Sequence, residues 1–265
     1  MATTGSSAAT ARVLAAGFLL IACDARPGAV AGVVRVAAAA DLRFVLDRLS
    51  TAFAAERPGT SVQATYGASG SLAAQIAAGG PFDVLLSADR AYPERLAADG
   101  LVDGAPFDYA TGRLVVWTSE RVAADVAARG LAALADATIV KASVADPSHA
   151  PYGRAAIAAL KNAGVYHVAA PKLVYGSNVA QAAQFAESGA ADAAVLAHAV
   201  AAHGPLAAKG RRVDVPADLH PPVRQAGCVL KSAGDPAAAR AFAAFLRGST
   251  ARAVLADAGF GPPAP

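Results

Sequence analysis

A glycine-rich turn between a strand-like run and a helical pattern constrains this chain more than any other feature. The turn is Gly67-Ala68-Ser69-Gly70-Ser71; a β-type run over residues 61–66 precedes it, and apolar residues at helical spacing follow it. The first backbone N–H groups of a helix have no intrahelical partners and carry a partial positive charge. The turn therefore predicts an anion site, to which the serines would add hydroxyl donors. Taken alone, the turn is also explained by a serine that merely caps its helix.

Strand and helix patterns alternate from residue 33 onward. Strand-like runs cover residues 33–39, 61–66 and 84–87, and helical patterns cover residues 42–53, a segment from Ser71 and a segment opening at Asp89. Asp41 stands at the expected N-cap of the 42–53 helix. This βαβαβα series predicts a parallel sheet with helices on both faces, whose ligands bind beyond the carboxyl ends of the strands. Asp41, Ser69 and Ser87 are all expected on that side.

A second alternating series follows. Its strands are expected at residues 114–117, 138–145, 173–175 and 193–196, and its helices at residues 122–129, 154–162 and 179–186. A strand over residues 222–230 and helices over residues 236–245 and 250–258 end the chain. Two such units, with a C-terminal segment that returns to the first, predict an α/β clamshell with a ligand cleft between its lobes. The expected lobes are residues 32–111 with 222–265, and residues 112–221.

The second unit has polar strand-to-helix turns of its own. The segment DPSHAPYG at residues 146–153 places the hydroxyl of Tyr152 beside free helix N–H groups. The turn YGSN at residues 175–178 offers Ser177 or Asn178 as a helix cap. Capping explains each turn separately, but polar turns in both units together favour one binding site between the lobes.

The first 31 residues have the layout of an export signal. Arg12 precedes a short apolar stretch at residues 13–22, and small residues follow. Two processing sites compete: residues 20–23 resemble a lipobox that would lipidate Cys23, and residues 29–31 fit ordinary signal peptidase, with the lipobox preferred. The expected location is periplasmic, with a lipid anchor at Cys23. Cys228 then has no disulfide partner in the mature chain and is expected to be a small buried hydrophobic residue.

Charge and motifs exclude several classes of function. The formal net charge is +3 and the arginines are scattered, which argues against a nucleic-acid surface. A P-loop lysine motif, an H-E-x-x-H metal motif and a G-x-S-x-G nucleophile elbow are all missing from the sequence. A Ser-dependent hydrolase stays open as the alternative of a different class, with Ser69 or Ser71 as nucleophile.

The motifs together resemble a known family. VAAAADLRF, YGASGSLAAQIAAGGPFDVLLSAD, YATGRLVVW, ADPSHAPYGRAAIAAL, YGSNVAQA and SGAADAAVLA occur in this order across residues 33–260. This combination is similar to the periplasmic molybdate-binding proteins of ABC transporters. The resemblance implies a type II periplasmic-binding-protein fold, capture of a tetrahedral oxyanion, molybdate or tungstate, and delivery to a membrane permease. It implies no cofactor, no enzymatic activity and a monomer.

The resemblance also implies a set of site residues. By position, the oxyanion donors of the family fall on Ala40, Asp41, Ser69, Tyr152 and Val179. Ala40 and Val179 would contribute only backbone N–H groups, and no residue would bind the metal atom directly. Neutral donors at several helix N-termini suit a dianion without any counter-charge.

Asp41 departs from the family pattern, in which a hydroxyl or amide is common. A carboxylate ~4 Å from a unit negative charge costs about 4 kcal/mol at an effective dielectric constant of about 20. Either Asp41 points away from the ligand as an N-cap, or the ligand differs. The alternatives are another oxyanion, sulfate or phosphate, or a hard metal cation bound by Asp41 with Tyr66 or Tyr152.

Overall fold

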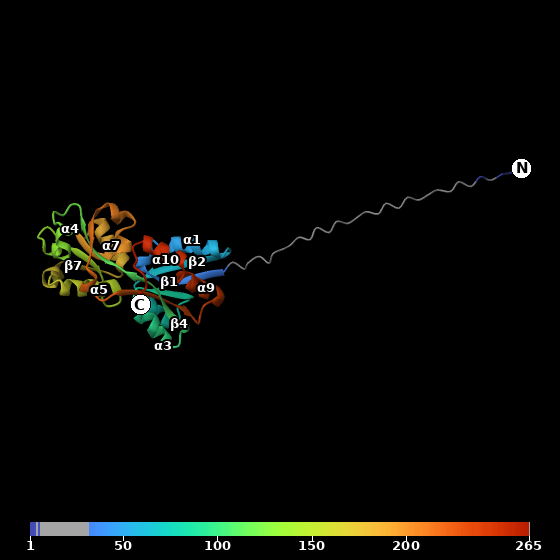
Figure 1. Ribbon diagram of the computed structural model, residues 1–265, viewed down its shortest axis with the longest axis horizontal. Helices are drawn as coiled ribbons and strands as arrows, with labels where there is room; N and C mark the ends of the chain where they lie inside the picture. Colours follow the sequence, from blue (N-terminus) through green and yellow to red (C-terminus); the bar gives the residue numbers. More distant parts are fainter. Residues whose placement is uncertain (4, 6–31, 265) are drawn as a thin grey trace.

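The computed structural model describes residues 1–3, 5 and 32–264 (Figure 1). The expected export signal and the lipidation site at Cys23 therefore lie outside the described residues. Within the described ranges, every helix is too short or too polar to cross a membrane.

The first five-stranded sheet has the order β2-β1-β3-β10-β4. Its strands are β1 (Gly32–Ala39), β2 (Thr60–Gly67), β3 (Val84–Ser87), β4 (Val102–Gly112) and β10 (Val223–Leu230). β1 pairs in parallel with β2 and β3, whereas β10 is antiparallel to both β3 and β4. Strand β10 therefore runs against the other four, and the C-terminal segment returns to the first sheet as expected.

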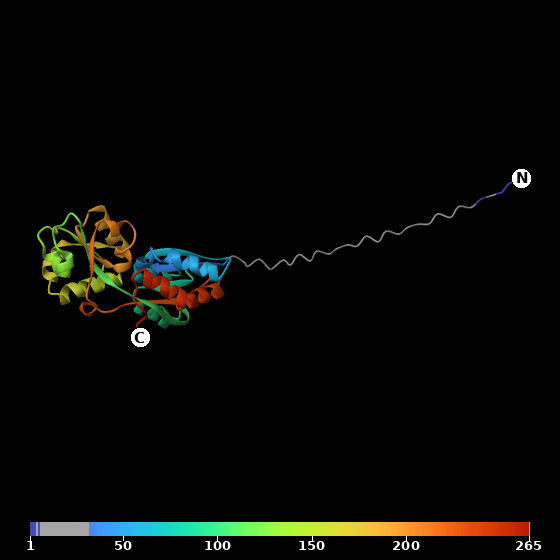
Figure 2. The same ribbon diagram turned by 45° about the horizontal axis from the view of Figure 1, so that its top comes forward.

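The second sheet repeats this plan in the order β7-β6-β8-β5-β9. Its strands are β5 (Leu114–Ser119), β6 (Ala142–Ala145), β7 (Leu173–Gly176), β8 (Ala193–Ala197) and β9 (Gly210–Asp214). β6 is parallel to β7 and β8, and β5 is antiparallel to β8 and β9. Figures 1 and 2 show the two sheets in separate lobes that lie side by side. The predicted two-lobed α/β clamshell is confirmed.

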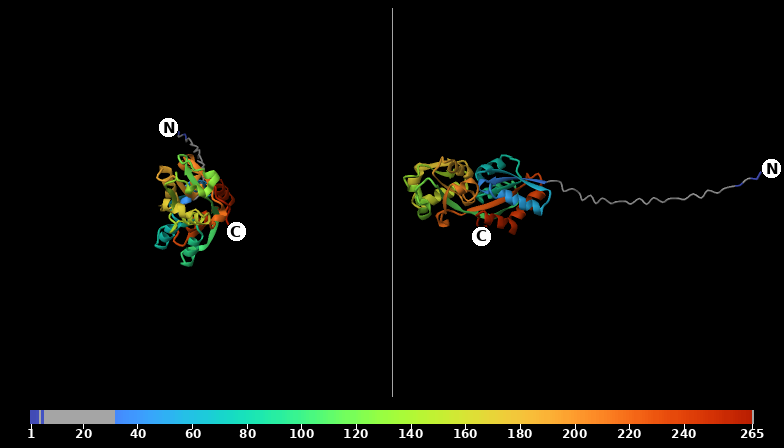
Figure 3. Two further views of the ribbon diagram at one scale, coloured as in Figure 1. Left: turned by 90° about the vertical axis from the view of Figure 1, so that its left-hand side faces the viewer. Right: turned by 90° about the horizontal axis from the view of Figure 1, so that it is seen from above.

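Helices flank both sheets, as two views at right angles show (Figure 3). Those of the first lobe are α1 (Leu46–Glu56), α2 (Ser69–Ala77), α3 (Ala91–Ala98), α9 (Pro236–Leu246) and α10 (Ser249–Asp257). Those of the second are α4 (Val126–Arg129), α5 (Pro151–Asn162), α6 (Tyr166–Ala169), α7 (Val179–Ser188) and α8 (His198–Ala201). Short 3-10 turns are η1 (Ala40–Leu42), η2 (Gly130–Ala135), η3 (Ala170–Lys172), η4 (Pro205–Ala208) and η5 (Ala217–Leu219).

Three phenylalanines hold α9, the helix that follows β10, against α1. Phe53 of α1 meets Phe242 and Phe245 of α9 at ring-centroid distances of 5.0 and 5.4 Å, and all three side chains are buried. Aromatic pairs at such distances stabilise beyond the area that they bury. This contact explains how the chain, which leaves the first lobe after β4, packs against that lobe again near its C-terminus.

Several predicted boundaries are wrong, each for a local reason. The helix expected at residues 42–53 begins at Leu46, because η1 precedes it, and Asp41 is not its N-cap. The helix expected from Ser71 begins at Ser69. Only Val126–Arg129 of the expected helix 122–129 is helical, with Asp125 as its cap. Of the expected strand 138–145 only Ala142–Ala145 forms, because the amides of Val140 and Lys141 bond to the Asp192 carboxylate instead of a strand.

Two strands, β4 and β9, were not predicted from the sequence. β4 contains Pro106 and a left-handed glycine, Gly104, both of which usually mark turns. β9 is an edge strand whose Arg211 and Arg212 are exposed, so it lacks the apolar alternation of a half-buried strand.

A buried carboxylate anchors the edge of the first lobe away from the second. Asp83, 1% exposed, accepts hydrogen bonds from the backbone amide of Arg35 (2.6 Å), from the Arg35 guanidinium (2.9 Å to Nη2) and from the amide of Gly234 (2.8 Å). These donors tie β1 and the segment after β10 to the start of β3.

Cys228, also in this lobe, is buried with a free thiol, as the sequence predicted.

Candidate functional site

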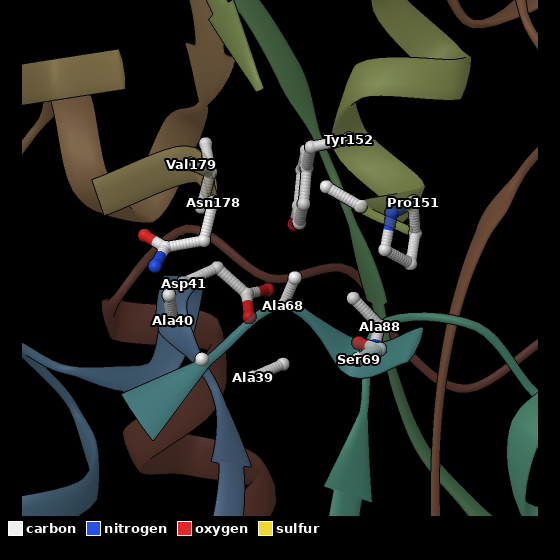
Figure 4. A pocket seen from close by; sticks show the side chains of 12 residues that line it. Ala39, Ala40, Asp41, Ala68, Ser69, Ala88, Pro151, Tyr152, Asn178 and Val179 are labelled. Atoms are coloured by element: carbon white, nitrogen blue, oxygen red, sulfur yellow. The ribbon is translucent and has the colours of Figure 1, made fainter. Parts of the chain in front are cut away.

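A small cavity lies where the strand-to-helix turns of the two lobes meet (Figure 4). Its volume is about 10 Å³, counted as the space open to the centre of a water-sized sphere, and its lining is Ala39, Ala40, Asp41, Gly67, Ala68, Ser69, Ala88, Ala150, Pro151, Tyr152, Asn178 and Val179. All five sequence-predicted site residues are in this set, whereas Ser71 and Ser87 are not. The volume lies below the ~300–1,000 Å³ typical of sites for drug-sized organic ligands, so the cavity suits a small ion.

Ser69 reaches the cavity from the first lobe. It is the first residue of α2, at the carboxyl end of β2, and its side chain is buried. Its Oγ accepts a hydrogen bond from the backbone amide of Ala88 at 3.0 Å, and it does not cap its helix. A hydroxyl that already accepts from an amide keeps its own hydrogen for donation. Ser69 is thereby oriented as a donor toward a ligand.

Tyr152 has the same arrangement in the second lobe. It lies in the first turn of α5, which follows β6, and it is 3% exposed. Gln225 Nε2 donates to the Tyr152 hydroxyl at 3.3 Å. The phenolic hydrogen is therefore available for donation, either to the neighbouring Asp41 carboxyl group or to a ligand. Two hydroxyl donors from opposite lobes thus line one cavity (Figure 4).

The N-terminus of α7 completes the second-lobe wall. Asn178 is its cap, as one of the two predicted candidates, and its Oδ1 accepts from the amides of Ala180 (3.0 Å) and Gln181 (3.1 Å). The cap does not take the amide of Val179, the first residue of the helix. That amide is the donor that the sequence analysis assigned to Val179. In the first lobe, Ala40 and Asp41 begin η1 at the carboxyl end of β1.

Asp41 lies inside the cavity and does not point away from it (Figure 4). Its side chain is 1% exposed, and Oδ2 accepts a hydrogen bond from Gln225 Nε2 at 2.6 Å. Among the described residues, Oδ1 has no hydrogen-bond partner. The prediction that Asp41 serves as an N-cap is wrong, because η1 places its side chain toward β10 and α5 rather than over the start of α1.

Two residues of this network, Gln225 and Tyr109, were missed in the sequence. The Tyr109 hydroxyl donates to Gln225 Oε1 at 2.9 Å, which turns Gln225 Nε2 toward Asp41 and Tyr152. Both lie on the strands that lead out of and back into the first lobe, β4 and β10. A glutamine inside the mostly apolar run of β10 was the available signal, because a buried amide needs partners.

Burial controls the protonation of this network. Burial raises the pKa of Asp41 to about 6, and hydrogen bonding to Tyr152 and Gln225 and to nearby backbone amides opposes that rise. Burial, together with the Asp41 charge, raises the pKa of both Tyr152 and Tyr109 well above the usual tyrosine value. Both hydroxyls therefore keep their protons. No arginine, lysine or histidine is among the lining residues, all of which the structure describes.

The lobes also touch outside the cavity. The amide of Gly70 in α2 donates to the carbonyl of His149 at 3.0 Å. Arg154 of α5 donates to the Tyr92 hydroxyl at 3.1 Å and pairs with Asp89. These contacts join the two walls of the cleft, so the structure is that of a closed clamshell.

Gly70 leaves no room for a side chain in this closed form. A Cβ at Gly70 would lie 2.7 Å from the Tyr92 hydroxyl and 2.9 Å from the His149 carbonyl oxygen. We expect Gly70→Ala to hold the lobes apart and to weaken ligand binding at least about tenfold, or about 1.4 kcal/mol. Small-angle scattering with ligand should show a larger radius of gyration than for the unmodified chain. Gly261→Ala is the control, since a Cβ there meets its neighbours at 3.6 Å or more.

The geometry disfavours two of the alternatives. Tyr66, proposed as a cation ligand beside Asp41, is 37% exposed at the end of β2 and does not line the cavity. Within the described residues, no group of three or more histidine, cysteine, aspartate or glutamate side chains could hold a metal ion. A hydrolase would need a base beside Ser69, yet the partner of its Oγ is a backbone amide.

Comparison with known proteins agrees with this geometry. The family model described as "Bacterial extracellular solute-binding protein" matches residues 34–261. The chain is 34% identical to the molybdate-binding protein ModA of Rhodobacter capsulatus, over 88% of this chain and 89% of that protein. It is also 34% identical to ModA of Azotobacter vinelandii, over 94% of this chain and 96% of that protein.

A solved structure extends the similarity to three dimensions. The periplasmic molybdate-binding protein of Azotobacter vinelandii superposes with a TM-score of 0.80 at 30% sequence identity, covering 87% of this chain and all of that one. The fold is therefore shared with that protein along its whole length.

Proposed function

We propose that this protein binds molybdate or tungstate, because the chain belongs to the bacterial extracellular solute-binding protein family and matches its ModA relatives along most of its length. The bound oxyanion is delivered to the permease of an ABC transporter. Like its relatives, the protein is a binding protein and not an enzyme.

One observation carries the proposal: Ser69 and Tyr152, from opposite lobes, both present hydroxyl hydrogens to one cavity whose other donors are helix N-termini. Each hydroxyl accepts from an amide, and each is buried. Hydrogen bonds to an anion are about twice as strong as bonds between neutral groups. Ala40, Asp41 and Val179 supply the backbone N–H groups. Such a set holds a dianion without a cation and releases it when the lobes part.

The ligand should be selected by size. Sulfate and molybdate carry the same charge and the same acceptor pattern, so a stiff cage rather than charge must separate them. We expect molybdate and tungstate to bind tightly and sulfate at least about a hundredfold more weakly, or about 2.7 kcal/mol. Titration calorimetry on the chain from Gly32 onward, with molybdate, tungstate, sulfate and phosphate, measures this. Equal affinity for sulfate would contradict size selection, and heat from metal cations alone would favour the cation alternative.

The finer features of this function are proposals as well. The protein works in the periplasm as a monomer, attached to the membrane by a lipid on Cys23. Residues 32–111 with 222–265 move as one lobe and residues 112–221 as the other, with the β4–β5 connection and residues 215–222 as hinges. The relatives support the periplasmic location and the transporter partner. The strand order supports the lobe boundaries, because within residues 32–264 the chain passes between the sheets only at these two places.

A further inference from the structure

The carboxyl group of Asp41 is at odds with a site for a dianion. It lies in the cavity, it is almost fully buried, and its Oδ1 has no partner among the described residues. An ionised carboxylate there would face the bound anion across a few ångströms of low-dielectric space and repel it. An unpaired oxygen in such a place needs either a cation or a proton.

The surroundings of Asp41 offer no cation. The titratable side chains that face it are Tyr152 of α5 and Tyr109 of β4, and both are neutral. η1 also packs against β2, α7 and α8. Their titratable groups lie elsewhere: Tyr66 is at the surface, Glu187 pairs with Lys209 at 3.5 Å, and His198 pairs with Asp214 at 3.0 Å. A proton is the remaining way to remove the repulsion.

The hydrogen bonds determine which oxygen would hold that proton. Tyr109 donates to Gln225 Oε1, so Gln225 presents its Nε2 hydrogens to Asp41 Oδ2. Oδ2 is thereby fixed as an acceptor. Oδ1 has no hydrogen-bond partner of normal geometry among the described residues, although the Tyr152 hydroxyl and the amides of Asp41 and Leu42 lie near the carboxyl group. A proton on Oδ1 can therefore be donated to an oxygen of the ligand.

We propose that Asp41 binds the oxyanion as a carboxylic acid whose proton, on Oδ1, is donated in a hydrogen bond to the anion. This inference rests on the proposed function. When the empty site is ionised, one proton from the solvent joins the carboxylate as one anion binds, so the site gains one positive and two negative charges. The O–H bond of Asp41 forms as an O–H or N–H bond of hydronium or of a buffer acid breaks, and no other covalent bond changes.

The direction of the pH effect follows from linkage. Burial raises the pKa of Asp41 to about 6, so the empty site loses its proton above that pH, whereas the complex keeps it. A complex that holds more protons than the free protein weakens as pH rises. The dissociation constant of the wild-type chain for molybdate should rise about tenfold per pH unit above about pH 6, that is ten- to a hundredfold between about pH 6 and pH 8.

The test is titration calorimetry with molybdate at about pH 8 in two buffers of different ionisation enthalpy, which counts the protons exchanged. The wild-type chain should take up close to one proton per anion. Asp41→Asn, whose amide can accept from Gln225 and donate to the ligand, should take up none, and its affinity should change less than about threefold between about pH 6 and pH 8. Asp47→Asn, an exposed carboxylate on α1, is the control that should behave like the wild type.

Three results would overturn the proposal. Molybdate binding by the wild type without proton uptake, and with flat pH dependence, would show that Asp41 stays ionised, while the proposed function stands. Phosphate binding more tightly than molybdate, with no proton uptake, would show that the ligand brings the proton. The absence of any oxyanion binding in the folded wild type and in Asp41→Asn would overturn the proposed function as well. The wild-type proton count decides the matter even if Asp41→Asn does not fold.

Discussion

Molybdate should bind about ten- to a hundredfold more weakly to Ser69→Ala and to Tyr152→Phe than to the unmodified chain. Each substitution removes one hydroxyl that would donate to a buried charged ligand, which is worth about 1.5–3 kcal/mol. Ser69→Ala should also lower stability by about 1–3 kcal/mol, because the buried amide of Ala88 loses its acceptor. Tyr152→Phe should lower it less, because Gln225 keeps its hydrogen bond to Asp41. Calorimetry gives the affinities and thermal unfolding of the ligand-free protein gives the stabilities.

The two losses should also be coupled. Closure needs donors from both lobes, so once one hydroxyl is absent the cleft closes less completely and the second substitution removes less than it does alone. The double variant should therefore lose less affinity than the sum of the single losses. Ser71→Ala and Tyr175→Phe are matched controls outside the cavity. If Tyr152→Phe binds like the wild type while Ser69→Ala does not, the ligand belongs to the first lobe alone.

Replacing Asp83 by alanine should lower the free energy of unfolding by about 3 kcal/mol or more. The carboxylate accepts from two backbone amides, and the loss of a buried acceptor costs about 1–3 kcal/mol for each of them. The Arg35 guanidinium is 40% exposed and can bond to water instead, so its loss adds little. Asp257→Ala is the control: its ion pair with Arg48 is exposed on both sides, so its loss should cost about 1 kcal/mol or less. Denaturant titration of both variants measures the difference.

The effect of Asp83 should disappear in acid. Hydrogen bonds from Arg35 and Gly234 outweigh burial and hold the pKa of Asp83 below its usual value. A carboxyl group with a lowered pKa in the folded state stabilises the fold above its unfolded pKa and loses that effect as pH falls through the folded value. The gap between wild type and Asp83→Ala should be full at neutral pH and should narrow toward the most acidic pH at which the wild type remains folded. A constant gap over that range would contradict the assignment.

The sequence predicted the elements whose signals are local. The apolar run at residues 33–39 and the glycine-rich turn at Ser69 specify a strand and a helix start through the residues themselves. The strand-to-helix turns then meet because carboxyl ends of parallel strands share one edge of a sheet. For this reason Ala40, Asp41, Ser69, Tyr152 and Val179 all line one cavity. Their role in binding remains a prediction.

The surroundings of Asp41 could not be predicted in this way. Its partner Gln225 is 184 positions away, and their contact depends on β10 returning between β3 and β4. An aspartate directly before a helical pattern predicts an N-cap from local propensity alone. In the structure, the tertiary contacts of Asp41 override that preference. The strand β9 was missed for a similar reason, since its pairing with β5 and not its own composition makes it a strand.

The central claim is that one tetrahedral oxyanion is held by both lobes in the cavity between them. Anomalous diffraction from crystals grown with tungstate locates the heavy atom without reference to any assumed site. We expect a single strong peak in the cavity, with oxyanion oxygens about 2.7–3.1 Å from Ser69 Oγ, the Tyr152 hydroxyl and the backbone nitrogen of Val179. A peak elsewhere, or one whose oxygens contact donors of only one lobe, would contradict the account.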